Sequence, residues 1–238
     1  MLATAQTAGA VGTGTQGAAK GKSITLAGSV SIVLEFFQFA INNILFQRGV
    51  YPPEAFGNVR KYNLSLLTTT DDGLKAYLDQ IFGQLQAWIA AKSIKKLVMV
   101  ISSKTTGEVL ERWQFDVNLD SSVANIPVAK ASLSKASAAA VAADQGEPTK
   151  TEKEIQAEIA AIMRQITASV SFLPMLNDPC TFNILVYTDK DAEVPATWVD
   201  SDPRMIARNA EQVRLRSFNT TVHHVEGLVA YRLDQDAC

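Results

Sequence analysis

Apolar residues recur with the 3.6-residue period of an α-helix in three segments of the chain. Ser29–Arg48 is apolar on almost every face, which is typical of a helix buried on all sides, and it is predicted to end at Gly49. Asp71–Asp72 cap a second helix, and Thr151 and Glu154 form the capping box of a third. The predicted inward positions are Leu74, Tyr77, Leu78, Ile81, Leu85, Trp88 and Ile89 in the second helix, and Ile155, Ile159, Ile162 and Ile166 in the third.

Other segments show the alternation or the continuous apolar runs of strands. Strands are predicted at Val59–Thr68, Lys95–Ser103, Glu108–Leu119 and Cys180–Thr188. The second and third of these are predicted to form a hairpin, because only "TTG" and its flanks separate them. Val109, Glu111, Trp113, Phe115 and Val117 share one face of the third strand.

The C-terminal region predicts two further strands, Val213–His224 and Leu228–Leu233, with Glu226–Gly227 as the turn. Both need a sheet edge to pair with. Ser23–Leu26 fits either a short strand or a lead-in to the first helix. The order of elements shows no βαβ rhythm, so the fold class is α+β: a mainly antiparallel sheet with three helices on one face.

Three segments lack these periods. Residues 1–22 are rich in Ala, Gly, Thr and Gln and predict a disordered tail. Residues 120–150 form a low-complexity loop, and Lys190–Glu211 is irregular. Trp198 in the irregular segment is predicted to pin it to the body of the protein, whereas Trp88 and Trp113 are predicted in the core.

Composition narrows the function classes. The net charge of −2 and the pI of about 5.7 give no case for nucleic-acid binding. No stretch is expected to reach the roughly 18 apolar residues of a membrane helix, and the N-terminus does not resemble a secretory signal. The two cysteines, Cys180 and Cys238, predict reduced thiols and a cytosolic or nuclear protein.

The sequence predicts no enzyme, no cofactor and no metal site. "GTGTQG" at Gly12–Gly17 matches a nucleotide-binding pattern, but no strand precedes it. His223 and His224, the two histidines of the chain, are adjacent on a predicted strand and therefore point to opposite faces. A solvent-facing or partner-facing role is expected for them rather than a catalytic one. The strand at Cys180–Thr188 could accept a peptide by strand addition, with an ordinary edge hairpin as the alternative.

Several long stretches resemble the HORMA-domain family, in its mitotic-arrest-deficient spindle checkpoint group. They include "SITLAGSVSIVLEFFQFAINNILFQRGVYPPEAF", "GEVLERWQFD", "IMRQITASVSFLPML", "ILVYTDKDAEVPATW" and "VRLRSF". The resemblance runs from about Ser23 to Tyr231 and implies a HORMA domain over 23–238. Residues 1–22 and 120–150 depart from the family pattern.

The resemblance implies two topologies. In an open form the C-terminal strands cover the edge beside Cys180–Thr188; in a closed form they cross to the opposite edge and displace the strand at Ser23–Leu26. The freed edge then takes a partner peptide beneath a "safety belt" at about 190–238. The implied edge residues are Thr181, Phe182, Asn183, Ile184, Leu185, Val186 and Tyr187, and those of the belt are Trp198, Arg214, Leu215, Phe218, Val222, His223 and Tyr231.

The resemblance also implies a surface for open–closed self-dimers at Arg164, Gln165 and Phe172, and a role for Leu26 in the conformational balance. The expected partners are a coiled-coil kinetochore scaffold, the co-activator of the anaphase-promoting complex, a comet-type HORMA antagonist and an AAA+ ATPase remodeller. Nucleus, kinetochore, nuclear envelope and cytoplasm are the expected locations. The alternative is a HORMA adaptor for DNA repair or meiotic chromosome axes, and an enzyme is the third class weighed.

Overall fold

The computed structural model describes residues 24–120 and 150–233. The predicted tail, most of the loop at 120–150, and Cys238 therefore lie outside the described residues. The helices are α1 (Leu26–Gln47), α2 (Asp72–Ala90) and α3 (Glu152–Ala168), with short 3-10 turns at Pro53–Ala55 and Ser169–Ser171. The strands are β1 (Phe56–Lys61), β2 (Leu64–Thr69), β3 (Ile94–Ser103), β4 (Val109–Leu119), β5 (Cys180–Thr188), β6 (Ala210–Arg214), β7 (Phe218–Asn219) and β8 (His223–Arg232).

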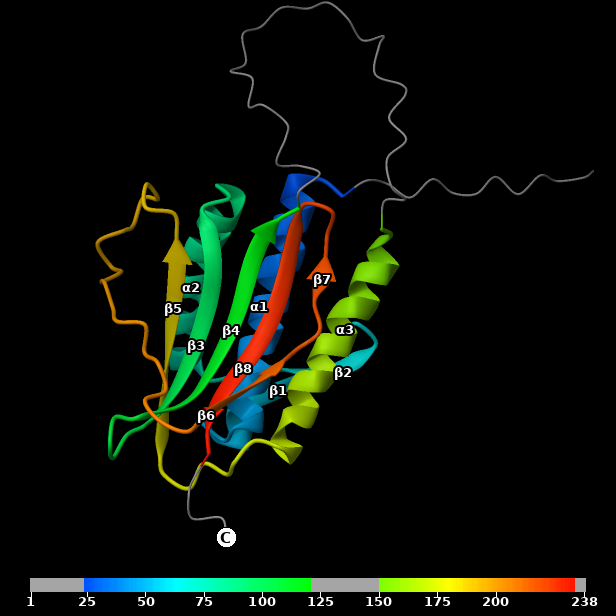
Figure 1. The fold of residues 1–238 in the computed structure, drawn as a ribbon. Coiled ribbons are helices and arrows are strands. Elements are labelled where there is room, and N and C mark those ends of the chain that lie inside the picture. The colour runs from blue at the N-terminus through cyan, green and yellow to red at the C-terminus, as the bar shows by residue number, and fades with distance from the viewer. Residues whose placement is uncertain (1–23, 121–149, 234–238) are drawn as a thin grey trace, which may run out of the picture.

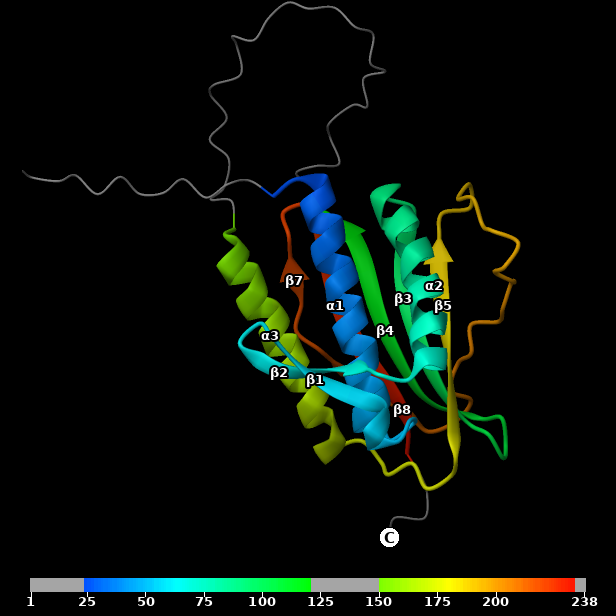
Figure 2. The same ribbon diagram turned by 180° about the vertical axis from the view of Figure 1, so that it is seen from behind.

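The main sheet is antiparallel, in the order β5-β3-β4-β8-β6, and β7 pairs with β8. All three helices cover one face of this sheet, as Figures 1 and 2 show from opposite sides. The separate β1–β2 hairpin lies against α1 on the side away from the sheet (Figure 2). The predicted α+β class is confirmed, with three helices on one antiparallel sheet.

Helix α1 forms the centre of the core. The side chain of Thr25 caps it by accepting a hydrogen bond from the amide of Gly28 at 3.2 Å, so Ile24 and Thr25 are a helix lead-in and not a strand. At the other end Gly49 adopts a φ of +63°, a left-handed conformation that suits glycine and ends the helix. Phe36 and Phe37 of α1 pack on Phe115 of β4, at centroid distances of 5.5 and 5.9 Å.

The sequence was expected to contain no segment apolar enough to span a membrane, and that expectation was wrong, because α1 is long and apolar enough. Of the helices in the described ranges, α1 has the required length, and its best 18-residue window has a mean hydropathy of 1.5. Burial accounts for this composition, since 67% of the window is buried inside the protein.

Local capping signals correctly located the other two helices. Asp71 Oδ1 accepts a hydrogen bond from the amide of Leu74 at 2.7 Å, and Thr151 and Glu154 cap α3 reciprocally. The predicted inward residues of both helices are buried except Tyr77, which is 41% exposed. Tyr77 lies at the edge of the stripe, where its ring packs at 5.7 Å on Phe182 of β5.

The single strand predicted at Val59–Thr68 is instead a hairpin formed by β1 and β2. Tyr62 and Asn63 form its turn, with φ values of 50° and 57°, as in the two-residue turns that suit twisted strands. The pair lacks the glycine that usually follows asparagine in such a turn, so the strand pattern continues through it in the sequence. The Tyr62 hydroxyl donates to Glu35 of α1, and Lys61 pairs with the same carboxylate at 2.8 Å.

The predicted C-terminal strands were also wrong in their boundaries. Glu226 and Gly227 lie inside β8, and the turn lies at residues 220–222, between β7 and β8. Gly227 has a packing role: a Cβ at this position would lie 3.1 Å from the side chain of Leu215. The amide of Leu215 donates to the Gly227 carbonyl at 2.8 Å, so this glycine admits the chain that folds back over β8.

Candidate functional site

The strand predicted to receive a peptide lies at one end of the main sheet. In the part of the chain that the structure describes, β5 pairs with β3 on one side and with no strand on the other. Ile184 points into the core at 8% exposure, whereas Thr181 and Asn183 are exposed. Phe182, Leu185, Val186 and Tyr187 are partly buried. β5 therefore presents backbone groups and apolar side chains to an added strand.

A groove of about 210 Å³ runs between this edge and the segment that follows β5. Its lining comprises Trp88, Ile184, Leu185, Val186, Tyr187, Thr188, Val194, Trp198, Val199, Asp200, Ser201 and Asp202. Val194 and Val199 are 56% and 86% exposed, so apolar surface of the segment remains open beside the edge. The groove has the position and composition needed to hold an extended peptide against β5.

Two tryptophans fix the segment over α2, as predicted for Trp198. Its ring packs at 4.9 Å and 70° on Trp88. The indole N–H of Trp88 donates to the carbonyl of Glu193 at 2.9 Å. Trp198 is part of the irregular segment and Trp88 is a core residue of α2, so the pair anchors the first half of the segment.

The same segment then crosses the outer side of the sheet to reach β6 (Figure 1). Arg112 of β4 lies beneath it at 7% exposure. Its Nε donates to the carbonyl of Pro203 at 3.4 Å, and one Nη donates to Gln114 Oε1 at 2.6 Å. A buried guanidinium therefore contacts the backbone of the crossing segment.

The C-terminal hairpin pairs with the opposite edge from β5. β8 follows β4 in antiparallel register from Glu111↔Tyr231 to Leu119↔His223, and β6 adds to the outside of β8. This pairing is the arrangement that the sequence resemblance assigned to the closed form. Leu26, expected to influence the balance of forms, is the first residue of α1 and is 38% exposed.

The predicted belt residues divide into exposed and buried sets. Arg214 is exposed in β6 and Leu215 is half-buried over Gly227. Phe218, Val222, His223 and Tyr231 are buried. Burial and the nearby Glu211 carboxylate, to which its hydroxyl donates at 3.3 Å, raise the pKa of Tyr231.

The expectation of an accessible His223 was wrong. Its side chain is 1% exposed, and Nδ1 lies 2.7 Å from the Ser29 hydroxyl of α1. β8 begins at His223 and pairs on both sides, so one face of the strand is turned into the helix layer. His224 lies on the other face, where its Nε2 is 3.0 Å from Glu226.

Residues of the predicted dimer surface lie around the C-terminal end of α3. Arg164 is exposed, as expected, and Phe172 is 43% exposed rather than in the core. Gln165 is half-buried, because its Oε1 accepts a hydrogen bond from the amide of Arg216 at 2.6 Å. Phe172 lies 6.4 Å from Tyr231. The surface is thus built from α3 and from the C-terminal hairpin together.

A buried ion pair was missed by the sequence interpretation. Arg48 Nε donates to Glu111 Oε1 at 2.7 Å, and the two side chains are 4% and 2% exposed. Glu111 also accepts from the indole N–H of Trp113, and Arg48 donates to the carbonyl of Pro174. The signal was present: Glu111 is the one carboxylate on the otherwise apolar face of β4.

Within the described ranges, no three His, Cys, Asp or Glu side chains gather in an arrangement that could hold a metal ion. Burial raises the pKa of the Cys180 thiol, with the Glu111 and Asp178 carboxylates adding to the effect. The features of the described chain around β5 are an unpaired strand edge and a groove lined by the segment that follows it.

Comparison with known proteins gives a consistent family. The model of the HORMA domain matches residues 29–223. The Dictyostelium discoideum protein named mitotic spindle assembly checkpoint protein MAD2A is 50% identical over 216 residues, 90% of this chain and 96% of that protein. The human protein of the same name is 48% identical over 212 residues, 89% and 94% of the two chains.

Solved structures agree. A chain in the crystal structure of the mitotic checkpoint complex matches with a TM-score of 0.72 and 48% identity, covering 87% of this chain and 99% of that one. Caenorhabditis elegans HTP-1, bound to a motif of HTP-3, matches at a TM-score of 0.65 over 89% and 93% of the two chains. Its identity is 14%, so that likeness concerns the fold.

Proposed function

The chain belongs to the HORMA-domain family, in its mitotic spindle checkpoint group, and from this premise we propose that it is a non-enzymatic checkpoint switch. It traps a partner peptide by strand addition at β5, changes between open and closed topologies, and inhibits the anaphase-promoting complex through its co-activator. The single observation that carries the proposal is the position of the C-terminal hairpin: β8 lies on β4, while the outer edge of β5 is unpaired in the described chain.

The geometry supports trapping rather than simple docking. A peptide of about six residues would add several backbone hydrogen bonds, each contributing roughly 1 kcal/mol net. The segment from Asp189 to Asn209 then encloses the peptide, because Trp198 anchors its first half on α2 and its far end continues into β6. Release requires this segment to detach, so the enclosure acts mainly on the dissociation rate.

The open form in this proposal places the hairpin on β5, where it occupies the peptide site. Conversion must break nine residue pairs between β8 and β4, from Glu111↔Tyr231 to Leu119↔His223, and slow exchange is therefore expected. A partner peptide favours the closed form because it binds where the open form pairs its own hairpin. Titration with a peptide from the co-activator, followed by NMR of β8, tests this; β8 signals unchanged from apo to saturation, with no slow conversion, would exclude the switch.

The proposed partners are the coiled-coil kinetochore scaffold, the co-activator, a comet-type HORMA antagonist and an AAA+ remodeller, with nucleus, kinetochore, nuclear envelope and cytoplasm as locations. For the checkpoint partners, support comes from the names of the relatives and from the complex in which the 48% identical chain was solved. The antagonist, the remodeller and the locations rest on the sequence resemblance. The solved structures at 14–15% identity share the fold alone, so they do not favour the meiotic or DNA-repair alternative. Affinity capture from mitotic cells distinguishes the two.

Trp198→Ala is expected to shorten the lifetime of the trapped peptide. The variant loses the ring that packs on Trp88 at 4.9 Å, and aromatic truncations at anchor positions cost about 2–4 kcal/mol. The dissociation rate, measured by chasing a fluorescent peptide, should rise by roughly 30-fold or more. Met205→Ala is the control, since this residue of the same segment is 65% exposed and lies outside the groove lining; equal rates in the two variants would contradict the anchoring role of Trp198.

Arg164→Glu is expected to abolish self-association and to leave peptide binding intact. Arg164 is an exposed residue of α3, whereas the peptide groove lies beside β5 at the far end of the sheet (Figure 1). Sedimentation velocity measures the first property and peptide titration the second. Lys153→Glu, a charge reversal at the exposed start of the same helix, is the matched control. Unchanged self-association of the Arg164 variant would count against this surface.

A further inference from the structure

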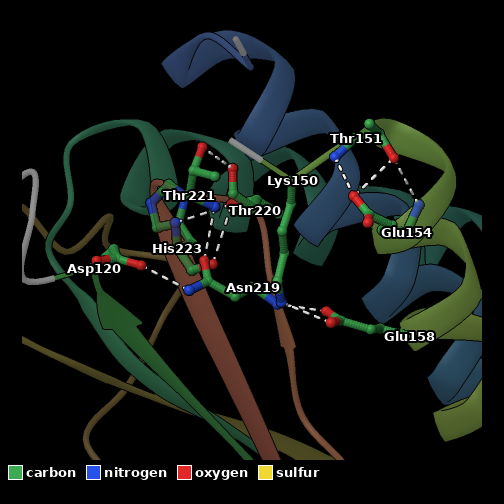
Figure 3. Close-up of polar contacts among 9 residues, drawn as sticks. All are labelled: Asp120, Lys150, Thr151, Glu154, Glu158, Asn219, Thr220, Thr221 and His223. Atoms are coloured by element: carbon green, nitrogen blue, oxygen red, sulfur yellow. Dashed lines mark hydrogen bonds and ion pairs between the residues drawn. The ribbon is translucent and has the colours of Figure 1, made fainter. Parts of the chain in front are cut away.

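A buried polar cluster joins the start of α1 to the turn between β7 and β8. The Ser29 hydroxyl lies 2.6 Å from Thr220 Oγ1 and 2.7 Å from His223 Nδ1. Thr220 Oγ1 also accepts a hydrogen bond from the His223 amide at 2.9 Å. Ser29 and Thr220 are 0% exposed and His223 is 1% exposed, so no solvent competes for these contacts. Figure 3 shows Thr220 and His223 at the turn.

The turn itself is held in place by its neighbours. The side-chain amide of Asn219 donates to Asp120 at the end of β4 at 2.6 Å, and its backbone N–H donates to Glu158 of α3 at 3.2 Å (Figure 3). Lys150 pairs with the same Glu158 carboxylate at 2.6 Å. The carboxylates of Asp120 and Glu158 are therefore bonded to Asn219. The imidazole of His223 instead faces the hydroxyl of Ser29.

The second ring nitrogen of His223, Nε2, makes no hydrogen bond of good geometry in the described ranges, although the Ile89 backbone interacts with the ring in the sense that favours its protonated form. Nε2 is fully buried and is the one such unsatisfied side-chain atom in the described ranges. A neutral imidazole needs one donor and one acceptor contact, whereas the protonated ring carries two N–H donors. The site offers a hydroxyl to Nδ1 and no well-aligned acceptor to Nε2. It therefore fits the neutral ring and disfavours the charged one.

The electrostatic surroundings act in the same direction. Burial lowers the pKa of His223, and Lys92 beyond the end of α2 lowers it further, against an opposing effect of the Ile89 carbonyl. On the same strand, His224 and Glu226 contact each other on the opposite face. The carboxylates on the neighbouring elements, Asp120 and Glu158, are bonded to Asn219.

We propose that the neutral imidazole of His223, held by Ser29 and Thr220, is the positioning group that seats the C-terminal hairpin on the β4 edge, and that proton uptake by this ring releases the hairpin. The inference rests on the proposed function in one respect, namely that the released hairpin can pair with β5 instead of β4. It makes His223 a determinant of the peptide-trapping topology, although the ring lies at the other side of the sheet from the peptide groove.

The direction of the pH dependence follows from proton linkage. The ring binds a proton more weakly in the seated hairpin than in a released one, where its pKa returns towards about 6.5. The pairing of the hairpin with β4 is therefore fully stabilised above this pH, and it weakens as the pH falls below it. The ratio of released to seated hairpin should rise by up to about tenfold for each pH unit in that window.

The experiment uses the full chain without peptide and follows the amide NMR signals of Val225 and Val229 in β8 from pH 7.5 to 5.5. The expected result is a second set of signals that grows below pH 6.5. His223→Asn keeps a neutral polar group near Ser29 and should give a profile independent of pH. His224→Asn is the matched control, because it removes the other histidine, and it should retain the parent profile.

Ser29→Ala provides a second variant. It removes the partner of Nδ1, so the released fraction should rise roughly tenfold at pH 7.5 and the midpoint of the profile should move. A pH profile that survives in His223→Asn, or an unmoved midpoint in Ser29→Ala, overturns the inference. Peptide trapping at pH 7.5 is measured in parallel; its failure would instead overturn the proposed function.

Discussion

Glu111→Leu is expected to lower the free energy of unfolding by about 3–5 kcal/mol, because it leaves the buried guanidinium of Arg48 without a counter-charge. The same change removes the acceptor for the indole N–H of Trp113, which lies 3.0 Å from Glu111 Oε2. The two residues join the end of α1 to the centre of the sheet, and Arg48 also donates to the Pro174 carbonyl ahead of β5. Urea denaturation followed by circular dichroism measures the loss.

Two controls define the cause. Lys95→Met breaks an ion pair with Asp189 whose side chains are 54% and 50% exposed, and pairs of this kind contribute only about 0–1 kcal/mol. The double variant Arg48→Met with Glu111→Leu should recover part of the stability, because no unpaired charge remains. If Glu111→Leu were as mild as Lys95→Met, the charge of Arg48 would not depend on Glu111 for its stabilisation.

Elements with complete local signals were predicted from the sequence. α2 and α3 begin at the residues that cap them, and β3 and β4 pair as their short connection requires. The β1–β2 turn was missed because Tyr62 and Asn63 lack the glycine that usually marks such turns. Gly227 was predicted to mark a turn, but it lies inside β8. A glycine is needed there because the side chain of Leu215 packs against it once the chain folds back over the strand.

The site was predicted less completely than the fold. Periodicity identified β5 as a strand, but its position at the end of the sheet depends on which strands pair, and that is set by tertiary contacts. The family resemblance named both possible edges for the hairpin, and the structure has it on β4. Burial of His223 depends on α1 lying across β8, since Ser29 and His223 are 194 residues apart in the chain. No local pattern carries that information.

Phe218→Ala is expected to remove about 3–5 kcal/mol from the topology in which the hairpin lies on β4. Phe218 is 1% exposed, and its ring packs edge-on against Phe36 of α1 at 4.9 Å. β7 is two residues long, so this ring provides most of its contact with the core. Because a topology with the hairpin on β5 moves this strand away from α1, the loss should fall on one form and shift the population towards the other.

NMR of β8 reports the population, and urea denaturation reports the overall stability. Met175→Ala, at a residue that is 80% exposed, is the control and should change neither. Phe218→Leu should give an intermediate loss, since it restores part of the buried volume. A Phe218→Ala variant that is destabilised but keeps the hairpin populations of the parent would show that both topologies bury this ring equally. In that case Phe218 would be buried wherever the hairpin pairs. The preference of the hairpin for β4 would then depend on the polar contacts of Ser29, Thr220 and His223 instead.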